Sequence, residues 1–193
     1  LLEAGTEQER RESLEFLISG VDRTSRLVNQ LLTMARLEPK SDPPPLQRID
    51  LSETVRNSLV QLTPWLLSKQ LELAFEDSAE PFHVMASATA IDIALNNLIT
   101  NAANFSPEHG VITVTLTEDN GFCHLRVEDQ GPGIDEEDRE RLFERFYSRG
   151  NPQGAGLGLT IVNTIATRLG GRITLVNRAE GGLRATLSVP HGQ

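Results

Sequence analysis

The stretch that decides the fold is Asn96-Asn97-Leu98-Ile99-Thr100-Asn101-Ala102-Ala103-Asn104-Phe105. Its apolar residues recur at helical spacing, which predicts a helix that Ser87 caps and that ends near Phe105. Asn97, Asn101 and Asn104 stand at i, i+4 and i+7, so they line one face of that helix. An amide oxygen can ligate Mg²⁺ and leave its charge to be balanced by phosphates. The alternative interpretation is a solvated polar face.

A second motif, Asp129-Gln130-Gly131-Pro132-Gly133-Ile134, lies downstream at the end of a predicted strand over 122–128. A carboxylate there can accept a hydrogen bond from an exocyclic amine such as adenine N6. The two glycines let the backbone approach a ring closely. Taken alone, the motif also fits a plain turn after a strand.

A third motif, Gly154-Ala155-Gly156-Leu157-Gly158-Leu159, opens a helix predicted over 158–169. Glycines at a helix start expose backbone N–H groups and the positive end of the helix dipole to phosphate. The motif does not follow a strand within a βαβ unit, so a dinucleotide-binding fold is disfavoured.

Between the second and third motifs lies the phenylalanine-rich segment Leu142-Phe143-Glu144-Arg145-Phe146-Tyr147. Its two phenylalanines suit the anchor of a mobile loop, and Arg145 and Arg149 are within reach of a polyphosphate. We expect residues 135–153 to form a lid over a ligand. A surface amphipathic turn with solvated arginines is the alternative.

The remaining periodicity predicts the rest of a domain. Asp50 and Glu53 have the spacing of a capping box for a helix over 51–69. Alternating or short apolar runs predict strands at 71–76, 82–85, 112–116, 122–128, 173–176 and 183–189. Since βαβ units are too few for a doubly wound fold, we predict an α+β fold: a two-layer α/β sandwich with a mixed sheet of about five strands and three helices.

The first 38 residues follow another pattern. Leu14, Val21, Val28 and Ala35 recur every seven residues in a helix predicted over 12–38. Residues 1–4 are interpreted as the stub of an earlier helix. Side-by-side packing with other helices in an intermolecular bundle is one interpretation, and an amphipathic helix lying on its own domain is the other. Four prolines between Pro39 and Pro45 forbid a helix. We therefore assign a truncated helical region to 1–38, a linker to 39–49 and a globular domain to 50–193.

Composition narrows the function. The net charge of -9 disfavours nucleic-acid binding, which needs clustered Lys and Arg. The single cysteine, Cys123, shares a strand face with Leu125 and Val127, so we interpret it as a small buried hydrophobe. No apolar run reaches the roughly 20 residues of a membrane span. The chain begins without Met or a signal-like segment, as a fragment of a longer protein would.

The order of the motifs carries a resemblance. An asparagine-bearing helix, the Asp129 turn, the phenylalanine-rich segment and the glycine-rich helix start resemble the N, G1, F and G2 boxes of sensor histidine kinases. These kinases belong to a larger superfamily with Hsp90, gyrase and MutL. The resemblance covers roughly residues 50–190, and the heptad helix resembles the second helix of the family's dimerisation and phosphoacceptor domain.

What the resemblance implies agrees with the chemistry of the motifs. Asn101 matches the Mg²⁺ ligand, Asn97 supports the metal and phosphates, and Asp129 matches the carboxylate that reads adenine. The residues implied for ATP binding are Asn97, Asn101, Asn104, Phe105, Asp129, Gly131, Gly133, Ile134, Arg145, Phe146, Arg149, Gly154, Gly156, Leu157 and Gly158.

The chain departs from the family in three places. Asn104 stands where Lys or Arg often contacts phosphate, Phe105 where Tyr often packs on adenine, and Ser87 where Asp often begins the helix. Phe105 preserves the apolar face. Asn104 removes a charge, which would give Arg145 or Arg149 more weight.

The resemblance implies an ATP:protein-histidine phosphotransferase with ATP and Mg²⁺ as cofactors. The intact parent would be a homodimeric membrane sensor with this part in the cytoplasm. It would phosphorylate a histidine absent from this chain and pass the phosphoryl group to a response regulator. One alternative is an ATPase of the Hsp90, gyrase and MutL type, but the 88–105 helix has Asp92 and no Glu to activate water. The other is a pseudokinase that serves as a nucleotide-sensing or dimerisation scaffold.

Overall fold

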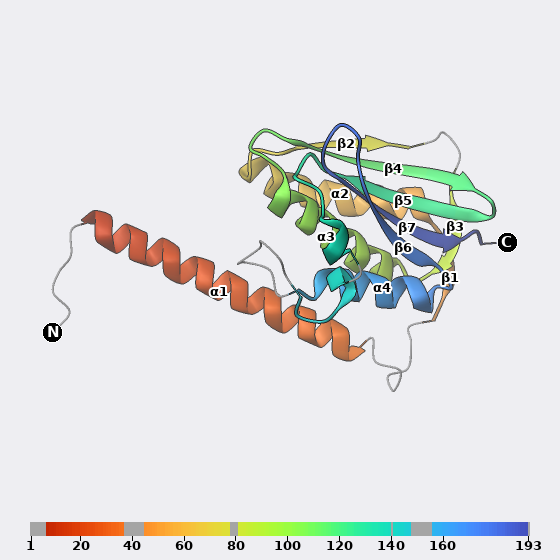
Figure 1. Ribbon diagram of the computed structural model, residues 1–193. Coiled ribbons are helices and arrows are strands. Elements are labelled where there is room, and N and C mark those ends of the chain that lie inside the picture. Colours follow the sequence, from red (N-terminus) through yellow and green to blue (C-terminus); the bar gives the residue numbers. More distant parts are fainter. Residues whose placement is uncertain (1–6, 37–44, 78–80, 140, 148–155, 193) are drawn as a thin grey trace. The chain divides into compact units, whose positions relative to one another are not determined.

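The computed structural model describes residues 7–36, 45–77, 81–139, 141–147 and 156–192. The chain divides into two compact units, residues 1–41 and 42–193. In the first unit the described element is α1 (Glu7–Arg36), drawn from red to orange in Figure 1. The predicted heptad helix is therefore confirmed, with an earlier start. Residues 1–6 and most of the proline-rich linker lie outside the described residues.

The heptad side chains of α1 are exposed. Leu14 is 58% exposed, Val21 64% and Val28 49%. Single exposed apolar side chains are common on protein surfaces. An apolar stripe along one helix, however, is typical of a surface that packs against another helix.

The second unit is built on a mixed sheet of five strands in the order β2-β4-β5-β7-β6. The strands are β2 (Glu72–Glu76), β4 (Val111–Asp119), β5 (Phe122–Glu128), β6 (Arg172–Asn177) and β7 (Leu183–Pro190). β2 runs parallel to β4, and the other neighbours are antiparallel.

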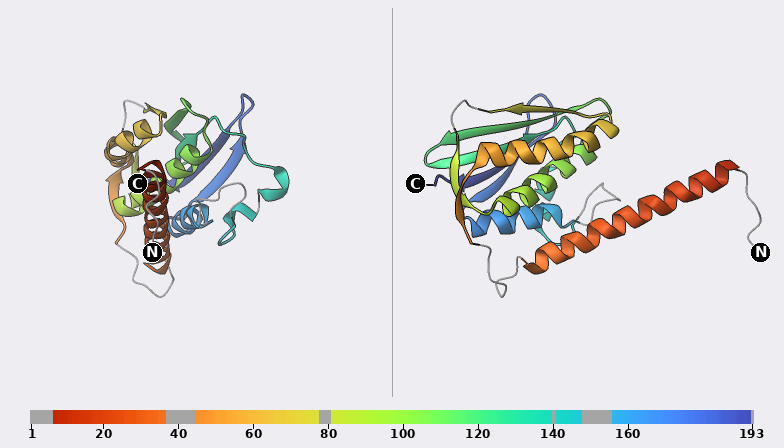
Figure 2. Two further views of the ribbon diagram at one scale, coloured as in Figure 1. Left: turned by 90° about the vertical axis from the view of Figure 1, so that its left-hand side faces the viewer. Right: turned by 180° about the vertical axis from the view of Figure 1, so that it is seen from behind.

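Three helices cover one face of this sheet: α2 (Leu51–Ser68), α3 (Ala88–Phe105) and α4 (Gly158–Arg168) (Figure 2). Strand residues alternate between this covered face and the opposite one, so Leu125 and Val127 are buried while His124 and Arg126 are only partly so. Cys123 is fully buried, and burial, with a smaller contribution from Glu118, raises the pKa of its thiol to about 11. The two-layer sandwich and the structural role of Cys123 are confirmed.

Two details correct the sequence analysis. β1 (Gln47–Asp50) was not predicted, and it pairs antiparallel with β3 (His83–Ala86) in a separate two-stranded sheet. β1 is too short and polar to show an alternating pattern. Ser87 precedes α3 as predicted, but its side chain makes no capping hydrogen bond. Asp50 does cap α2, since its Oδ1 accepts from the N–H groups of Ser52 (2.9 Å) and Glu53 (3.2 Å).

Candidate functional site

Asp129 follows β5 directly and is buried, with 6% of its surface exposed. Its Oδ1 accepts hydrogen bonds from the backbone N–H of Gly131 (2.8 Å) and of Leu183 (3.0 Å). Among the described residues, none donates to Oδ2. One carboxylate oxygen thus holds the backbone, and the other is free to accept from a ligand.

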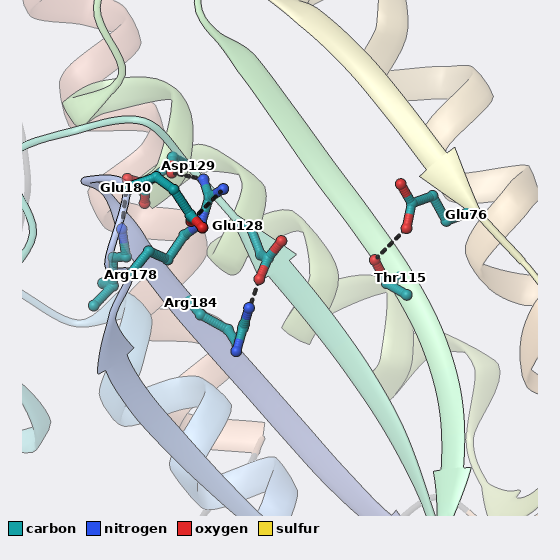
Figure 3. A network of polar contacts seen from close by, with 8 residues as sticks. Glu76, Thr115, Glu128, Asp129, Arg178, Glu180 and Arg184 are labelled. Atoms are coloured by element: carbon teal, nitrogen blue, oxygen red, sulfur yellow. Dashed lines mark hydrogen bonds and ion pairs between the residues drawn. The ribbon is translucent and has the colours of Figure 1, made fainter.

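Burial dominates the electrostatics of this carboxyl. It raises the pKa of Asp129 above the ordinary value, although the two backbone hydrogen bonds and the charge of Arg178 oppose the rise. Arg178 also donates from Nη1 to the backbone carbonyl of Asp129 (2.7 Å). Its Nη2 lies 3.6 Å from Glu180 Oε2 (Figure 3). A buried carboxylate with one free oxygen suits a ligand that offers an N–H group.

The loop after Asp129 lies against the end of α3. A Cβ atom on Gly131 would stand 2.6 Å from the carbonyl oxygen of Phe105, so any side chain there would displace the helix end. Gly133 has φ +75°, a conformation that favours glycine. Phe105, whose backbone carbonyl meets this loop, is 39% exposed. Both glycines therefore lie in close contact with neighbouring parts of the protein, and their approach to a ligand ring stays a prediction.

The start of α4 lies against the middle of α3. A Cβ atom on Gly158 would stand 3.1 Å from Asn97 Oδ1 and 3.6 Å from the amide atoms of Asn101. The helix has no side-chain cap and no acidic residue in its first turn. Among the described residues, no side chain accepts from its first N–H groups, which lie next to two amide side chains, and an anionic oxygen would satisfy them.

α3 joins these two regions. Asn97 and Asn101 precede Phe105 by eight and four residues, which corresponds to about 6–12 Å along a helix axis. The separation is on the scale of a nucleotide, with the carboxylate and Phe105 at one end and the amides and helix start at the other. Asn104 is half-buried on the same helix.

The phenylalanine-rich segment is described as far as residue 147. Phe146 is 66% exposed and has φ +64°, and its N–H donates to the carbonyl of Gly156 (3.0 Å). Thr160 of α4 bonds the carbonyls of Phe143 (3.1 Å) and Glu144 (3.3 Å). Arg145 is exposed and Leu157 is buried, whereas Arg149 and Gly154 lie outside the described residues.

Comparison with known proteins identifies the domain. Residues 86–193 match the family model described as histidine kinase-, DNA gyrase B- and HSP90-like ATPase. The chain belongs to this ATPase family.

The relatives narrow the family to sensor histidine kinases. The swarming motility regulation sensor protein RssA of Serratia marcescens is 32% identical over 176 residues, which cover 90% of this chain and 37% of that protein. The catalytic domain of histidine kinase ThkA is 30% identical with a TM-score of 0.70, covering 76% of this chain and 95% of that one. Full-length ShkA in complex with AMPPNP is 27% identical with a TM-score of 0.79. The match covers 98% of this chain and 40% of ShkA.

Residues 86–193 therefore lie in a sensor histidine kinase ATP-binding domain. The chain spans less than half the length of RssA and of the similar sensor protein QseC. No helix among the described residues has the length and apolarity to cross a membrane.

The single carboxylate of α3 in this ATP-binding domain points away from the amides. Asp92 accepts a hydrogen bond from Ser58 of α2, on the side of α3 that packs against that helix. A carboxylate that faces α2 is badly placed to activate water beside Asn97 and Asn101. This geometry disfavours the hydrolytic chemistry of the Hsp90 type.

Two residues at the site were missed by sequence analysis. Asn177 bonds the backbone of Ile134, and Arg178 bonds that of Asp129. Gly182 also packs on Asp129, since a Cβ atom on it would meet the Asp129 carbonyl oxygen at 1.9 Å. The available signal was the position of Asn177 and Arg178 directly after a predicted strand, and it does not reveal a partner more than 40 residues earlier.

Proposed function

We propose that this ATP-binding domain binds Mg·ATP and transfers the γ-phosphoryl group to a histidine of a dimerisation domain. The acceptor histidine lies outside this chain, since the first histidine here is His83, in β3. The phosphoryl group then passes to an aspartate of a response regulator. The histidine kinase ThkA, whose fold matches this chain with a TM-score of 0.80, was solved in complex with the response regulator protein TrrA.

The observation that carries the proposal is the pairing of two chemically different ends on α3. The buried carboxyl of Asp129, with its free Oδ2, suits the adenine amino group. The uncapped start of α4 beside Asn97 and Asn101 suits the phosphates and a metal ion held between phosphate and amide oxygens. ShkA, with which the chain shares 27% identity, was solved with the ATP analogue AMPPNP.

Individual roles follow from these positions. Asn101 is proposed as the Mg²⁺ ligand, with Asn97 and Asn104 beside the phosphates. Phe105, Gly131, Gly133 and Ile134 would line the adenine pocket, and Arg145, Phe146, Arg149, Gly154, Gly156, Leu157 and Gly158 would form the phosphate side. Positioning and charge neutralisation would supply most of the catalysis.

The parent protein is proposed to be a dimer in a bacterial inner membrane, with this region in the cytoplasm. The exposed stripe of Leu14, Val21 and Val28 on α1 suits packing in a helical bundle. The domain assignment proposed above, with 1–38 as part of the dimerisation region, follows from the same stripe.

The test is phosphoryl transfer in trans. The chain is incubated with γ-labelled ATP, Mg²⁺ and a separately produced dimerisation domain that carries the acceptor histidine. Acid-labile, alkali-stable label should appear on that domain and disappear when its histidine is replaced. Binding of ATP without any transfer to that histidine would instead support a nucleotide-sensing scaffold.

A further inference from the structure

The hairpin between β6 and β7 reaches the loop that follows Asp129. Asn177 is the cross-strand neighbour of Leu183. Leu183 in turn exchanges hydrogen bonds with Asp129, accepting from its N–H (3.0 Å) and donating to its Oδ1 (3.0 Å). Asn177, Leu183 and Asp129 therefore form one row across three strands at the end of the sheet.

The two outer members of this row hold the two ends of the loop. Asp129 Oδ1 accepts from the N–H of Gly131 at the beginning of the loop (2.8 Å). At its end, Asn177 Oδ1 accepts from the N–H of Ile134 (2.8 Å), and Asn177 Nδ2 donates to the carbonyl of Ile134 (2.7 Å). Such a reciprocal pair fixes a backbone segment as a rung of a β-ladder does.

Little else holds the loop. Among the described residues, no other hydrogen bond reaches the backbone N–H and C=O groups of residues 131–134. Asn177 also occupies the space beside Gly133, where a Cβ atom would stand 2.7 Å from Asn177 Oδ1. The conformation at the end of the loop, at Gly133 and Ile134, thus depends on this one exposed side chain.

We infer that Asn177 is a positioning residue for the nucleotide base: it holds the Gly133–Ile134 backbone in the conformation that leaves Asp129 Oδ2 open to the ligand. The inference rests on the proposed binding of ATP by Asp129. Without Asn177, the loop would become ordered only when the nucleotide binds. The entropic cost of that ordering would weaken the affinity. Because Asn177 is exposed, its removal should cost little stability.

The test compares three variants by calorimetry with Mg·ATP. Asn177→Ala should raise the dissociation constant about tenfold through loss of preorganisation. Asn177→Asp keeps the acceptor for the Ile134 N–H but places a second oxygen against the Ile134 carbonyl, so it should not restore affinity. Gln130→Ala is the matched control. It removes another exposed amide whose Oε1 accepts from a backbone N–H, that of Val111 (3.0 Å), and it should leave affinity within roughly twofold.

Two further measurements separate positioning from general damage. The unfolding midpoints of all the variants should stay close to that of the wild type. Hydrogen exchange of the Ile134 amide should be faster in both Asn177 variants and unchanged in Gln130→Ala. Wild-type affinity in Asn177→Ala, or restored affinity in Asn177→Asp, would overturn the inference. A wild-type chain that binds no ATP would overturn the proposed function itself, and the role of Asn177 with it.

Discussion

At the scale of single residues, Asp129 combines two roles in one carboxyl group. Oδ1 stabilises the turn by accepting from Gly131 and Leu183, while Oδ2 remains for a ligand. Burial makes the charge costly, as the raised pKa shows. In the proposed site, the side chain would serve binding at some expense of stability, which is common where a charged group is buried for function.

Replacement of Asp129 by Asn should separate these roles. The amide oxygen can keep the hydrogen bonds from the two backbone N–H groups, but an NH₂ group replaces Oδ2 and faces the adenine amine. We expect ATP affinity to fall by about 1.5–3 kcal/mol, or roughly 10- to 150-fold. Calorimetry measures the affinity, and an unchanged dissociation constant would remove Asp129 from the base site.

The same variant should reveal the raised pKa of Asp129 as a pH-dependent stability. The folded protein holds the carboxyl proton more tightly than the unfolded chain, so ionisation destabilises the fold. The free energy of unfolding of Asp129→Asn, relative to that of the wild type, should therefore increase as pH rises above 3.8, the ordinary pKa of the carboxyl. The difference should level off above the raised pKa. Urea unfolding across that window tests it, and an advantage that shrinks with rising pH would show that the pKa is lowered.

Local signals explain which site residues the sequence could reveal. The Asp129 motif can be recognised in the sequence because glycines follow the aspartate. The backbone there needs residues without a Cβ atom, as at Gly131. Asn177 carries no such signal, because its partner Ile134 is 43 residues away in the chain. The sequence also predicted the amide-bearing helix face and the glycine-rich helix start. The ligand roles of the predicted residues stay predictions.

At the scale of elements, the site depends on how closely α4 approaches α3. Gly158 permits that approach, since a methyl group there would press on Asn97. Periodicity predicted both helices and all five strands of the main sheet, because each has an apolar face to bury. β1 was missed because its pairing with β3 depends on tertiary contacts rather than on a pattern of its own.

Gly158→Ala should therefore weaken nucleotide binding without unfolding the domain. Alanine favours a helix more than glycine, so the unfolding midpoint should hold or rise. Its methyl group would displace the amide of Asn97, and ATP affinity should fall roughly threefold or more. Thr167→Ala, near the other end of α4, gains helix propensity without touching the amides and serves as the control. Equal affinity in the two variants would contradict the steric argument.

Asn101→Ala should act on the metal rather than on the base. If the amide oxygen ligates Mg²⁺, the gain in ATP affinity on adding Mg²⁺ should shrink, while binding in EDTA should change little. Asn96→Ala removes a neighbouring exposed amide that, among the described residues, bonds within α3, and it should keep the full Mg²⁺ effect. An intact Mg²⁺ effect in Asn101→Ala would assign the metal to other ligands.

At the scale of the whole molecule, the chain joins an amphipathic helix to an ATP-binding domain that forms its own compact unit. The described sheet and its three helices form their own core in residues 42–193, so nucleotide binding should not require α1. The exposed stripe of α1 suits packing against further helices, as in the proposed dimerisation bundle. The lid expected over 135–153 lies partly outside the described residues and stays a prediction.

This division predicts that the chain alone does not become phosphorylated on histidine. His83 is in β3, His109 precedes β4, His124 bonds Ser188 in the sheet (2.8 Å), and His191 Nε2 lies 3.8 Å from Glu118 Oε1. None is on α1. Incubation with γ-labelled ATP and Mg²⁺ should therefore leave no acid-labile, alkali-stable label. Such a label on this chain would make one of its own histidines an acceptor.

The measurement that tests the central claim most directly is calorimetric titration of the wild-type chain with ATP, with and without Mg²⁺. The account predicts saturable binding of one ATP per chain, tighter with Mg²⁺ and strongly weakened by Asp129→Asn. No heat of binding under either condition, in a chain shown to be folded by its unfolding transition, would contradict the assignment of a nucleotide site to Asp129 and the amides of α3.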